Sequence, residues 1–208
     1  METIQKEKVK LTAKVVSQEA LTDDICSMWI QADEIAKAAK PGQFISVYTK
    51  DKSKVLPRPI SLCEIDKEQG RLRIVYRVVG AGTKEFSAYQ AGDDIEIMGP
   101  LGNGFPLKEK KAFLIGGGIG IPPMLELAKN LKGHLMLITG DVDKNVPPSS
   151  TYRLADALIK ANKRFDMFIL PGKDHGVMCP YYQNLIRYYF VENLIQPVKQ
   201  HIDIINHN

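Results

Sequence analysis

A cluster of glycines in the middle of the chain has the spacing of an anion-binding turn. It follows an apolar segment and stands just before the prolines at 122 and 123. Glycine lets a ligand approach the backbone closely, and proline is favoured in the first helical turn. The free amide groups at the start of such a helix attract a phosphate or another anion. The glycines concerned are Gly116, Gly117, Gly118 and Gly120.

A second set of candidate residues comes earlier in the chain. Two of its arginines could each donate two hydrogen bonds to a phosphate, and a small-residue turn at 80–84 could bind phosphate through its amides. Each feature alone has a plainer interpretation, namely a surface ion pair, a core tyrosine or a hairpin turn. Their occurrence together favours a binding site. The set comprises Arg58, Pro59, Ile60, Ser61, Val75, Tyr76, Arg77, Gly82 and Thr83.

The elements that would carry the second set are short strands. Segments of the first hundred residues alternate apolar and polar side chains, which is typical of half-buried strands. A helical turn is expected at 33–40, before Pro41 and Gly42. Strands at this spacing predict an antiparallel six-stranded barrel over residues 1–108. The expected strands lie at 8–20, 25–32, 43–50, 59–66, 71–79 and 93–100.

The rest of the chain has a different pattern. Two apolar segments, 134–140 and 165–172, alternate with helical periodicity at 151–162 and 181–195. Together with a strand at 112–115, these segments predict a small three-layer parallel α/β region over residues 109–208. Within it, residues 109–133 would be the start of one domain, and residues 134–208 would be a fragment of a different domain.

The composition limits the classes of function. The chain has 208 residues, a formal charge of +4 and scattered lysines, which does not favour nucleic-acid binding. It has no apolar run of about 18 residues, so no membrane-spanning helix is expected. Its three cysteines, Cys26, Cys63 and Cys179, form no pair with metal-ligand spacing. We therefore predict a cytoplasmic protein without a metal site.

Residues 1–132 resemble the electron-transfer subunit of dihydroorotate dehydrogenase, in the ferredoxin–NADP reductase superfamily. The matching motifs are PGQF (41–44), RPIS (58–61), VYR (75–77), GT (82–83), GPLGNGF (99–105) and GGGIGIPP (116–123). The resemblance implies an FAD-binding barrel, with Arg58 on the pyrophosphate and Ser61 near the isoalloxazine edge. It also places Pro59, Ile60, Val75, Tyr76, Arg77, Gly82 and Thr83 against FAD. Gly117, Gly118 and Gly120 would face the nicotinamide of NADH, and a dihydroorotate dehydrogenase catalytic subunit would be the partner.

The sequence departs from this family after residue 132. Such a subunit continues into a full nucleotide domain and ends with four clustered cysteines that hold a [2Fe–2S] cluster. This chain has a single cysteine after Cys63, so no such cluster is expected. It keeps only the first strand and helix of the nucleotide domain. FAD binding is therefore predicted, NADH binding is doubtful, and electron transfer is expected to be impaired.

Residues 134–208 resemble the C-terminal end of the prolyl oligopeptidase family, of the dipeptidyl-peptidase IV type. The motif GDVDKNV would put the family's catalytic acid at Asp143, and GKDHG would put its base at His175. In such hydrolases the acid orients the imidazole, which takes the proton of a serine. The chain has no G-x-S-x-G motif for that serine. Without that serine, a loop histidine bonded to Asp174 or Asp143 is the favoured interpretation of His175 over a catalytic base.

The two resemblances meet within residues 127–133, so we interpret the chain as a chimera. Three functions remain open. The first is a flavin-dependent electron-transfer component that takes electrons from NADH. The second is a serine peptidase fragment without its nucleophile. The third is a non-catalytic folded chimera.

Overall fold

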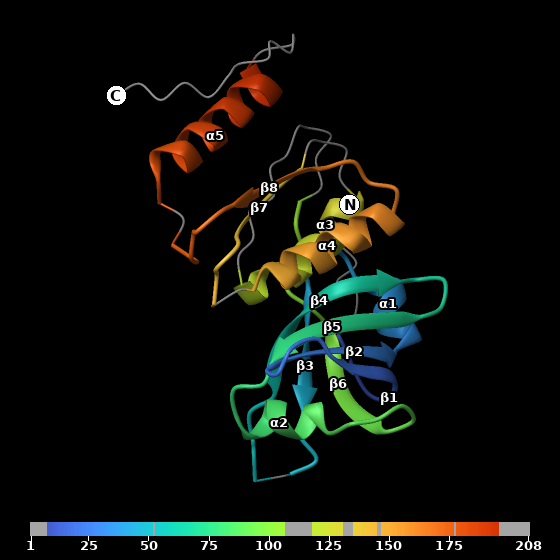
Figure 1. Cartoon of the computed structure of the whole chain (residues 1–208). Helices are drawn as coiled ribbons and strands as arrows, with labels where there is room; N and C mark the ends of the chain where they lie inside the picture. Colours follow the sequence, from blue (N-terminus) through green and yellow to red (C-terminus); the bar gives the residue numbers. More distant parts are fainter. Residues whose placement is uncertain are drawn as a thin grey trace, which may run out of the picture. The chain divides into compact units, whose positions relative to one another are not determined.

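A computed structural model describes residues 8–51, 53–106, 118–130, 135–144, 147–176 and 178–195. The chain divides into two compact units. The first contains the strands of the N-terminal part together with the helix at 122–130. The second contains the strands and helices that follow it. Figure 1 shows the helices and strands of each unit.

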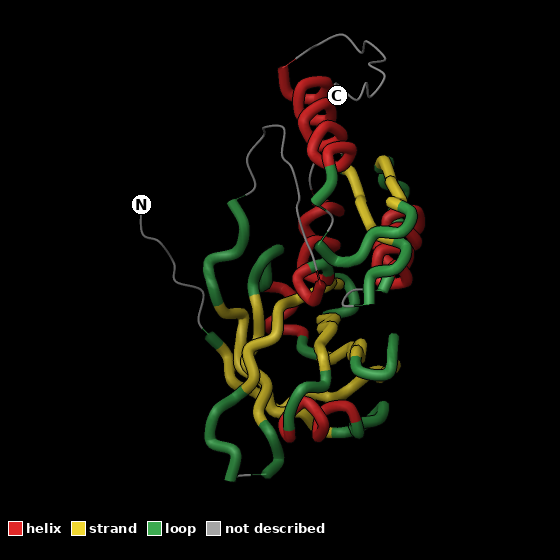
Figure 2. The backbone as a smooth tube through the Cα atoms, turned by 60° about the vertical axis from the view of Figure 1, so that its left-hand side comes forward, coloured by secondary structure: helices red, strands yellow, loops and turns green. Residues whose placement is uncertain are grey.

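The first unit is a closed antiparallel barrel, as the sequence predicts (Figures 1 and 2). The strand order around the barrel is β1-β2-β5-β4-β3-β6. Closure gives every strand two hydrogen-bonded neighbours, which removes the exposed edges of an open sheet. The strands are β1 (Val9–Ala20), β2 (Ile25–Gln31), β3 (Phe44–Tyr48), β4 (Arg58–Asp66), β5 (Arg71–Arg77) and β6 (Asp94–Leu101).

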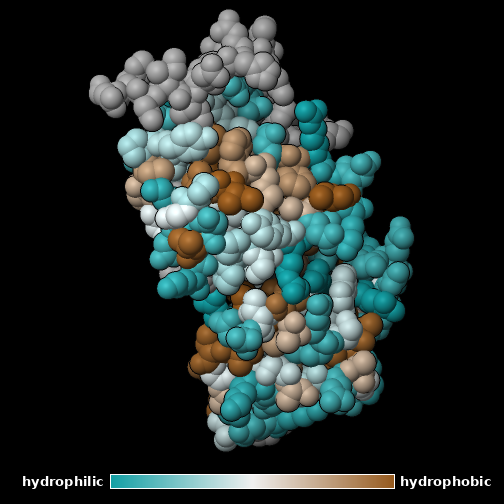
Figure 3. Space-filling model, in the orientation of Figure 1, coloured by the Kyte–Doolittle hydropathy of each residue, from teal (hydrophilic) through white to brown (hydrophobic). Residues whose placement is uncertain are grey.

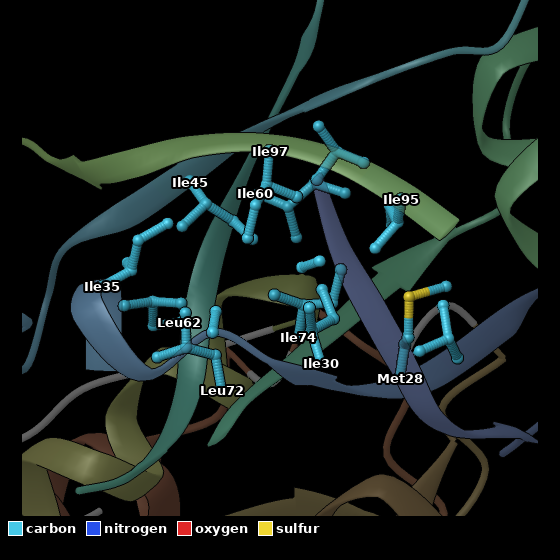
Figure 4. Packing of buried hydrophobic residues seen from close by; sticks show 14 of the residues in the cluster. Met28, Ile30, Ile35, Ile45, Ile60, Leu62, Leu72, Ile74, Ile95 and Ile97 are labelled. Atoms are coloured by element: carbon cyan, nitrogen blue, oxygen red, sulfur yellow. The ribbon is translucent and has the colours of Figure 1, made fainter. Parts of the chain in front are cut away.

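Alternation along each strand fills the barrel with aliphatic side chains. On β4, Ile60 and Leu62 point into the core, whereas Pro59 and Ser61, which alternate with them along the strand, are exposed. Figure 4 shows the inward side chains of neighbouring strands in contact, and the short helix α1 (Asp33–Ala38) adds Ile35 to them. The period of two that predicts the strands therefore also decides which residues form the core.

Two motifs singled out in the sequence interlock in the barrel. In PGQF, the Gln43 side chain donates to the carbonyl of Gly102 at 2.7 Å. In GPLGNGF, the Phe105 amide donates to the carbonyl of Pro41 at 2.8 Å. Gly42 has a φ of +83°, and a Cβ there would lie 2.3 Å from the Phe105 ring. These motifs therefore contribute to the packing of the barrel.

The turn expected at 80–84 is instead the start of a helix, α2 (Ala81–Ser87). Thr83 Oγ1 accepts hydrogen bonds from the amides of Val79 and Gly80, at 3.0 and 3.2 Å. The same hydroxyl donates to the carbonyl of Gly80 at 3.1 Å. The Thr83 hydroxyl thus caps the start of α2, at the point where the segment that follows β5 turns into the helix.

The helix that follows the glycine cluster, α3 (Pro122–Asn130), packs on β4 and belongs to the barrel unit. Glu126 Oε2 accepts a hydrogen bond from the Ile65 amide at 3.0 Å. Lys129 forms an ion pair with Glu64, which also pairs with Arg73 at 2.6 Å. The domain boundary at residue 108 stays a prediction. The strand expected at 112–115 lies outside the described residues.

The second unit contains a parallel pair of strands, β7 (Met136–Gly140) and β8 (Asp166–Leu170). Helix α4 (Pro148–Lys160) connects them and packs on β7 (Figure 1). Helix α5 (Pro180–Phe190) follows β8 and continues into the π-helical turn η2 (Val191–Ile195). The small parallel β/α region predicted after the barrel is confirmed.

The described helices are also too short or too polar to cross a bilayer. On the face shown in Figure 3, hydrophilic residues surround separate apolar patches. Within the described residues, no group of three or more histidine, cysteine, aspartate or glutamate side chains is arranged to hold a metal ion.

Candidate functional site

The guanidinium of Arg58 lies directly against Gly82. Arg58 is the first residue of β4, and Gly82 is in the first turn of α2. A Cβ at position 82 would lie 2.8 Å from Arg58 Nε and 2.9 Å from Cζ, which is closer than side chains tolerate. Arg58 Nη1 also donates to the carbonyl of Leu56. The structure thus brings two predicted site residues together, and a side chain at position 82 would displace the Arg58 guanidinium from this close approach.

The residues next to Arg58 on β4 divide between the two sides of the barrel wall. Pro59 and Ser61 are exposed on the outer side, and Ile60 is buried in the core at 8% exposure. Strand β5 lies alongside β4, with Leu62 opposite Ile74. Because the two strands are antiparallel, the segments before Leu62 and after Ile74 lie toward the same end of the pair. RPIS and VYR are therefore near one another, as a common site requires.

Tyr76 is a core residue in this structure. Its side chain is 3% exposed, its ring meets Phe86 edge-on, and its hydroxyl accepts a hydrogen bond from Gln18 at 2.8 Å. Burial raises the pKa of this hydroxyl well above its ordinary value. Contact of Tyr76 with a flavin stays a prediction, and it would have to involve the backbone or a movement of the ring.

The two neighbours of Tyr76 lie on the other side of β5. Val75 is 8% exposed and is not part of the barrel core. Arg77 pairs through Nε with Asp24 at 3.1 Å, and both side chains are partly exposed. Arg77 is thus already engaged by a carboxylate, whereas Arg58 is held by a backbone carbonyl. Among these arginines, Arg58 has the environment better suited to an anion.

The glycine cluster is described only in part. Gly118 and Gly120 bound a short 3₁₀ turn, η1 (Gly118–Gly120), which contacts β5 and leads into α3. Gly120 is exposed, and a Cβ there would meet nothing within 4 Å. Gly117 lies outside the described residues. The turn therefore lies beside the strand that carries Val75, Tyr76 and Arg77.

Asp143 and His175 form a hydrogen-bonded pair in the second unit. Asp143 follows β7 and His175 follows β8, and the carboxyl ends of parallel strands meet at one edge of the sheet. Asp143 Oδ2 lies 2.9 Å from His175 Nδ1, and the Asp143 side chain is only 8% exposed. Asp174 accepts a hydrogen bond from the His175 amide at 2.7 Å. This geometry would orient an imidazole for proton transfer.

One residue beside the first site was missed from the sequence. Glu85, one turn after Gly82 on α2, accepts hydrogen bonds from the Lys50 amide at 2.6 Å and from the Tyr89 hydroxyl at 2.8 Å. The spacing of Glu85 and Tyr89 is typical of side chains on one helix face and could have indicated their contact. The contact with Lys50 depends on tertiary structure.

Comparison with known proteins also divides the chain into an N-terminal and a C-terminal part. Residues 12–105 match the family model of the oxidoreductase FAD-binding domain, and residues 122–197 match that of the prolyl oligopeptidase family. A solved structure of an NADH-dependent reduced ferredoxin–NADP oxidoreductase aligns with a TM-score of 0.68 and 24% identity. That alignment covers 87% of this chain and 64% of the other. At this identity the likeness establishes the fold.

Curated relatives match the N-terminal part. The electron transfer subunit of dihydroorotate dehydrogenase B (NAD(+)) from Streptococcus mutans is 45% identical over 127 residues, which is 59% of this chain and 49% of the relative. The subunit of the same description from Streptococcus pneumoniae strain R6 is 42% identical, with 58% and 48% covered. The chain spans about half the length of these relatives. The barrel of this chain is therefore homologous to the FAD-binding domain of dihydroorotate dehydrogenase electron transfer subunits, and a prolyl oligopeptidase family match follows it.

Proposed function

We propose that this chain is a flavin-binding electron-transfer protein whose barrel binds FAD. The observation that carries the proposal is the close approach of the Arg58 guanidinium to Gly82 on a barrel of FAD-binding type. A guanidinium held at a glycine leaves its remaining donors available to a bulky anion, and no side chain at position 82 is in the way. In this proposal Arg58 binds the pyrophosphate of FAD, and the exposed Ser61 lies near the isoalloxazine ring.

The chemistry of the flavin, once bound, is the transfer of electrons from a hydride donor to an acceptor. The protein's part is to bind and orient it. Arg58 neutralises the pyrophosphate, Gly82 allows its approach, and the buried Thr83 fixes the turn that leads to Gly82. Val75 and Arg77, on the outer side of β5, would border the ring system.

Titration of the purified chain with FAD tests the proposal. Binding should quench flavin fluorescence and shift the visible absorption band at micromolar protein. Arg58→Ala should weaken FAD binding at least about tenfold, because a charge-assisted hydrogen bond to phosphate is lost. Unaltered binding by Arg58→Ala would exclude Arg58 as the pyrophosphate ligand, and no binding by the unaltered chain would exclude the function.

Lys14→Ala is the matched control. Lys14 is an exposed cation on β1, which is three places from β4 in the closed strand order and therefore on the other side of the barrel. Its removal changes the net charge by the same amount as Arg58→Ala. The control should bind FAD like the unaltered chain, so any difference between the two variants reports a local contact.

The same proposal includes the electron donor and the partner. The donor in this proposal is NADH, which would contact the turn at Gly118 and Gly120, and the acceptor is a dihydroorotate dehydrogenase catalytic subunit. Electron transfer is expected to be impaired, with no [2Fe–2S] cluster from this chain's three cysteines. Bleaching of the bound flavin by NADH would demonstrate the donor step and contradict the impairment at that step. The three free cysteines fit a reducing, cytoplasmic compartment.

A second candidate function follows from the 2.9 Å contact between Asp143 and His175. This pair could serve as the acid and base of a peptidase if a serine were supplied by another chain. The sequence holds no G-x-S-x-G motif, so no covalent labelling by a fluorophosphonate is expected. Labelling of any serine of this chain would support the peptidase and overturn that expectation.

A further inference from the structure

Arg58 depends on a loop for its position. The loop at 49–57 joins β3 to β4, and Arg58 is the first residue after it. Within this loop Thr49 Oγ1 donates to the carbonyl of Asp51 at 3.1 Å, and Lys54 pairs with Asp51 at 2.9 Å. These short-range bonds make the loop a compact turn, but they do not attach it to α2, where Gly82 lies.

The Glu85 carboxylate makes that attachment. Its Oε1 accepts a hydrogen bond from the Lys50 amide at 2.6 Å, and its Oε2 lies 3.9 Å from Lys54 Nζ. Lys50 is near the start of the loop and Lys54 is in its middle, four residues before Arg58, so one side chain contacts both. The Glu85 side chain is only 20% exposed, which reduces competition from water for these bonds.

The Glu85 carboxylate is itself held in place. The Tyr89 hydroxyl donates to Oε1 at 2.8 Å, and Tyr89 is 6% exposed and packed beside Phe86. The Lys50 ammonium lies 4.6 Å above the Tyr89 ring. Burial, together with the hydrogen bond to Glu85, raises the pKa of the Tyr89 hydroxyl, so it remains a donor over the whole neutral range.

Glu85 lies three residues after Gly82 on α2, so both are on one face of the helix. We propose that Glu85 is a positioning residue that fastens the β3–β4 loop to α2 and so keeps the Arg58 guanidinium against Gly82. Its effect on FAD rests on the proposed function, whereas its effect on the loop does not. Glu85 touches no ligand in this proposal and acts through Arg58.

Affinity for FAD is the first test, using Glu85→Ala, Glu85→Gln and Glu34→Ala in the full chain. Glu85→Ala should raise the FAD dissociation constant about tenfold, because Arg58 must then be ordered on binding. Glu85→Gln keeps an acceptor for Lys50 and Tyr89 and should stay within about threefold of the unaltered chain. Glu34, an exposed acid on α1, is the charge-matched control and should have no effect.

A double-mutant cycle separates positioning from general destabilisation. If Glu85 acts through Arg58, then Glu85→Ala should cause no further loss of FAD affinity in an Arg58→Ala background. A loss of equal size in both backgrounds would overturn the proposal.

The FAD-free protein provides a readout that does not depend on the proposed function. A nuclear Overhauser effect between Arg58 Hε and Gly82 Hα should be present in the unaltered chain and in Glu85→Gln, and absent in Glu85→Ala. Exchange of the Lys50 amide proton should be faster in Glu85→Ala alone. An unchanged Overhauser effect in Glu85→Ala would overturn the inference even if FAD binds. If no FAD binds and the effect is lost as expected, only the proposed function fails.

Discussion

The barrel and the parallel β/α unit differ in how completely they bury their apolar residues. Among the described residues, only Leu158 of the large side chains shielded fully from solvent belongs to the second unit, and the others lie in the barrel unit. In the barrel each strand pairs on both sides, whereas β7 and β8 pair within the described residues only with each other. Exposed large apolar side chains occur in both units, for example Val55 and Val79 in the first and Ile159 and Met178 in the second, so the difference lies in the fully buried side chains.

This difference bears on the two candidate sites. Arg58 stands on a strand of a closed, well-filled barrel, which is a rigid support of the kind that precise binding requires. Asp143 and His175 stand on loops after two strands of a small sheet. We therefore expect the barrel to hold its site more firmly, and the following predictions test that comparison.

The largest expected effects come from cavities in the two cores. Leu72→Ala in the barrel should cost about 2–5 kcal/mol of unfolding free energy, since Leu72 is fully buried. Leu158→Ala makes the matching change on α4. Amide hydrogen exchange should show faster exchange in β2 and β5 for the first variant and in β7 and β8 for the second. Equal acceleration of all strands in either variant would contradict two separate cores.

A pair of glycine substitutions should separate stability from binding. A Cβ at Gly140 would lie 2.0 Å from the Lys173 carbonyl oxygen, a backbone atom that cannot easily move. Gly140→Ala should therefore lower the unfolding free energy by about 1–3 kcal/mol and disturb the loop that carries His175. Gly82→Ala meets the end of the Arg58 side chain, which can swing away. It should reduce FAD affinity with little effect on thermal unfolding, and the reverse pattern in the two variants would refute this distinction.

The attachment of α3 to the barrel should depend on pH. Burial acts to raise the pKa of the Glu64 carboxyl, but hydrogen bonds from Lys129 and Arg73 outweigh it and lower the pKa below its ordinary value. A lowered pKa stabilises the fold above the unfolded value, and this contribution is lost as the pH falls through the folded value. Glu64→Gln should lower the unfolding free energy by about 1–2 kcal/mol near pH 7.

Denaturant unfolding of both forms across the acid range measures this effect. The difference in unfolding free energy between the unaltered chain and Glu64→Gln should shrink as the pH falls below about 4.3, the ordinary pKa of a glutamate side chain. A difference that grew at low pH would mean that the sign of the pKa shift is wrong. Glu68→Gln, which removes an exposed acid in the turn between β4 and β5, is the matched control.

The smallest effects should be the same in both units. Lys14 pairs with Asp94 at 2.8 Å in the barrel, and Lys160 pairs with Asp156 at 2.7 Å on α4, all with largely exposed side chains. Replacement of either lysine by alanine should change the unfolding free energy by less than about 0.5 kcal/mol. Thermal unfolding measures both, and a larger loss in one unit would show that surface charge contributes to the difference between them.

Much of the fold could be predicted because its signals are local. Alternation within β1, β2 and β5 predicts each strand from its own residues, and the spacing of the strands predicts the barrel. Helix α1 was expected before Pro41 and Gly42, and it ends at Ala38. The small-residue turn expected at 80–84 is instead the first turn of α2. Small residues suit both a turn and a capped helix start, and the Thr83 hydroxyl decides between them.

The candidate sites could be predicted only as sets of residues. Motif and resemblance selected Arg58 and Gly82 without their mutual contact. For Asp143 and His175 they included a bond between the two side chains, which the structure contains. The roles of all four residues stay predictions. The sequence alone determined most of the strands and helices, because side-chain alternation and helical periodicity act between near neighbours, whereas α2 was not predicted. Tertiary structure decided that Arg58 lies on Gly82, that Tyr76 faces the core and that Glu85 holds Lys50. Such contacts depend on strand register and loop closure, which bring together residues that no local pattern connects.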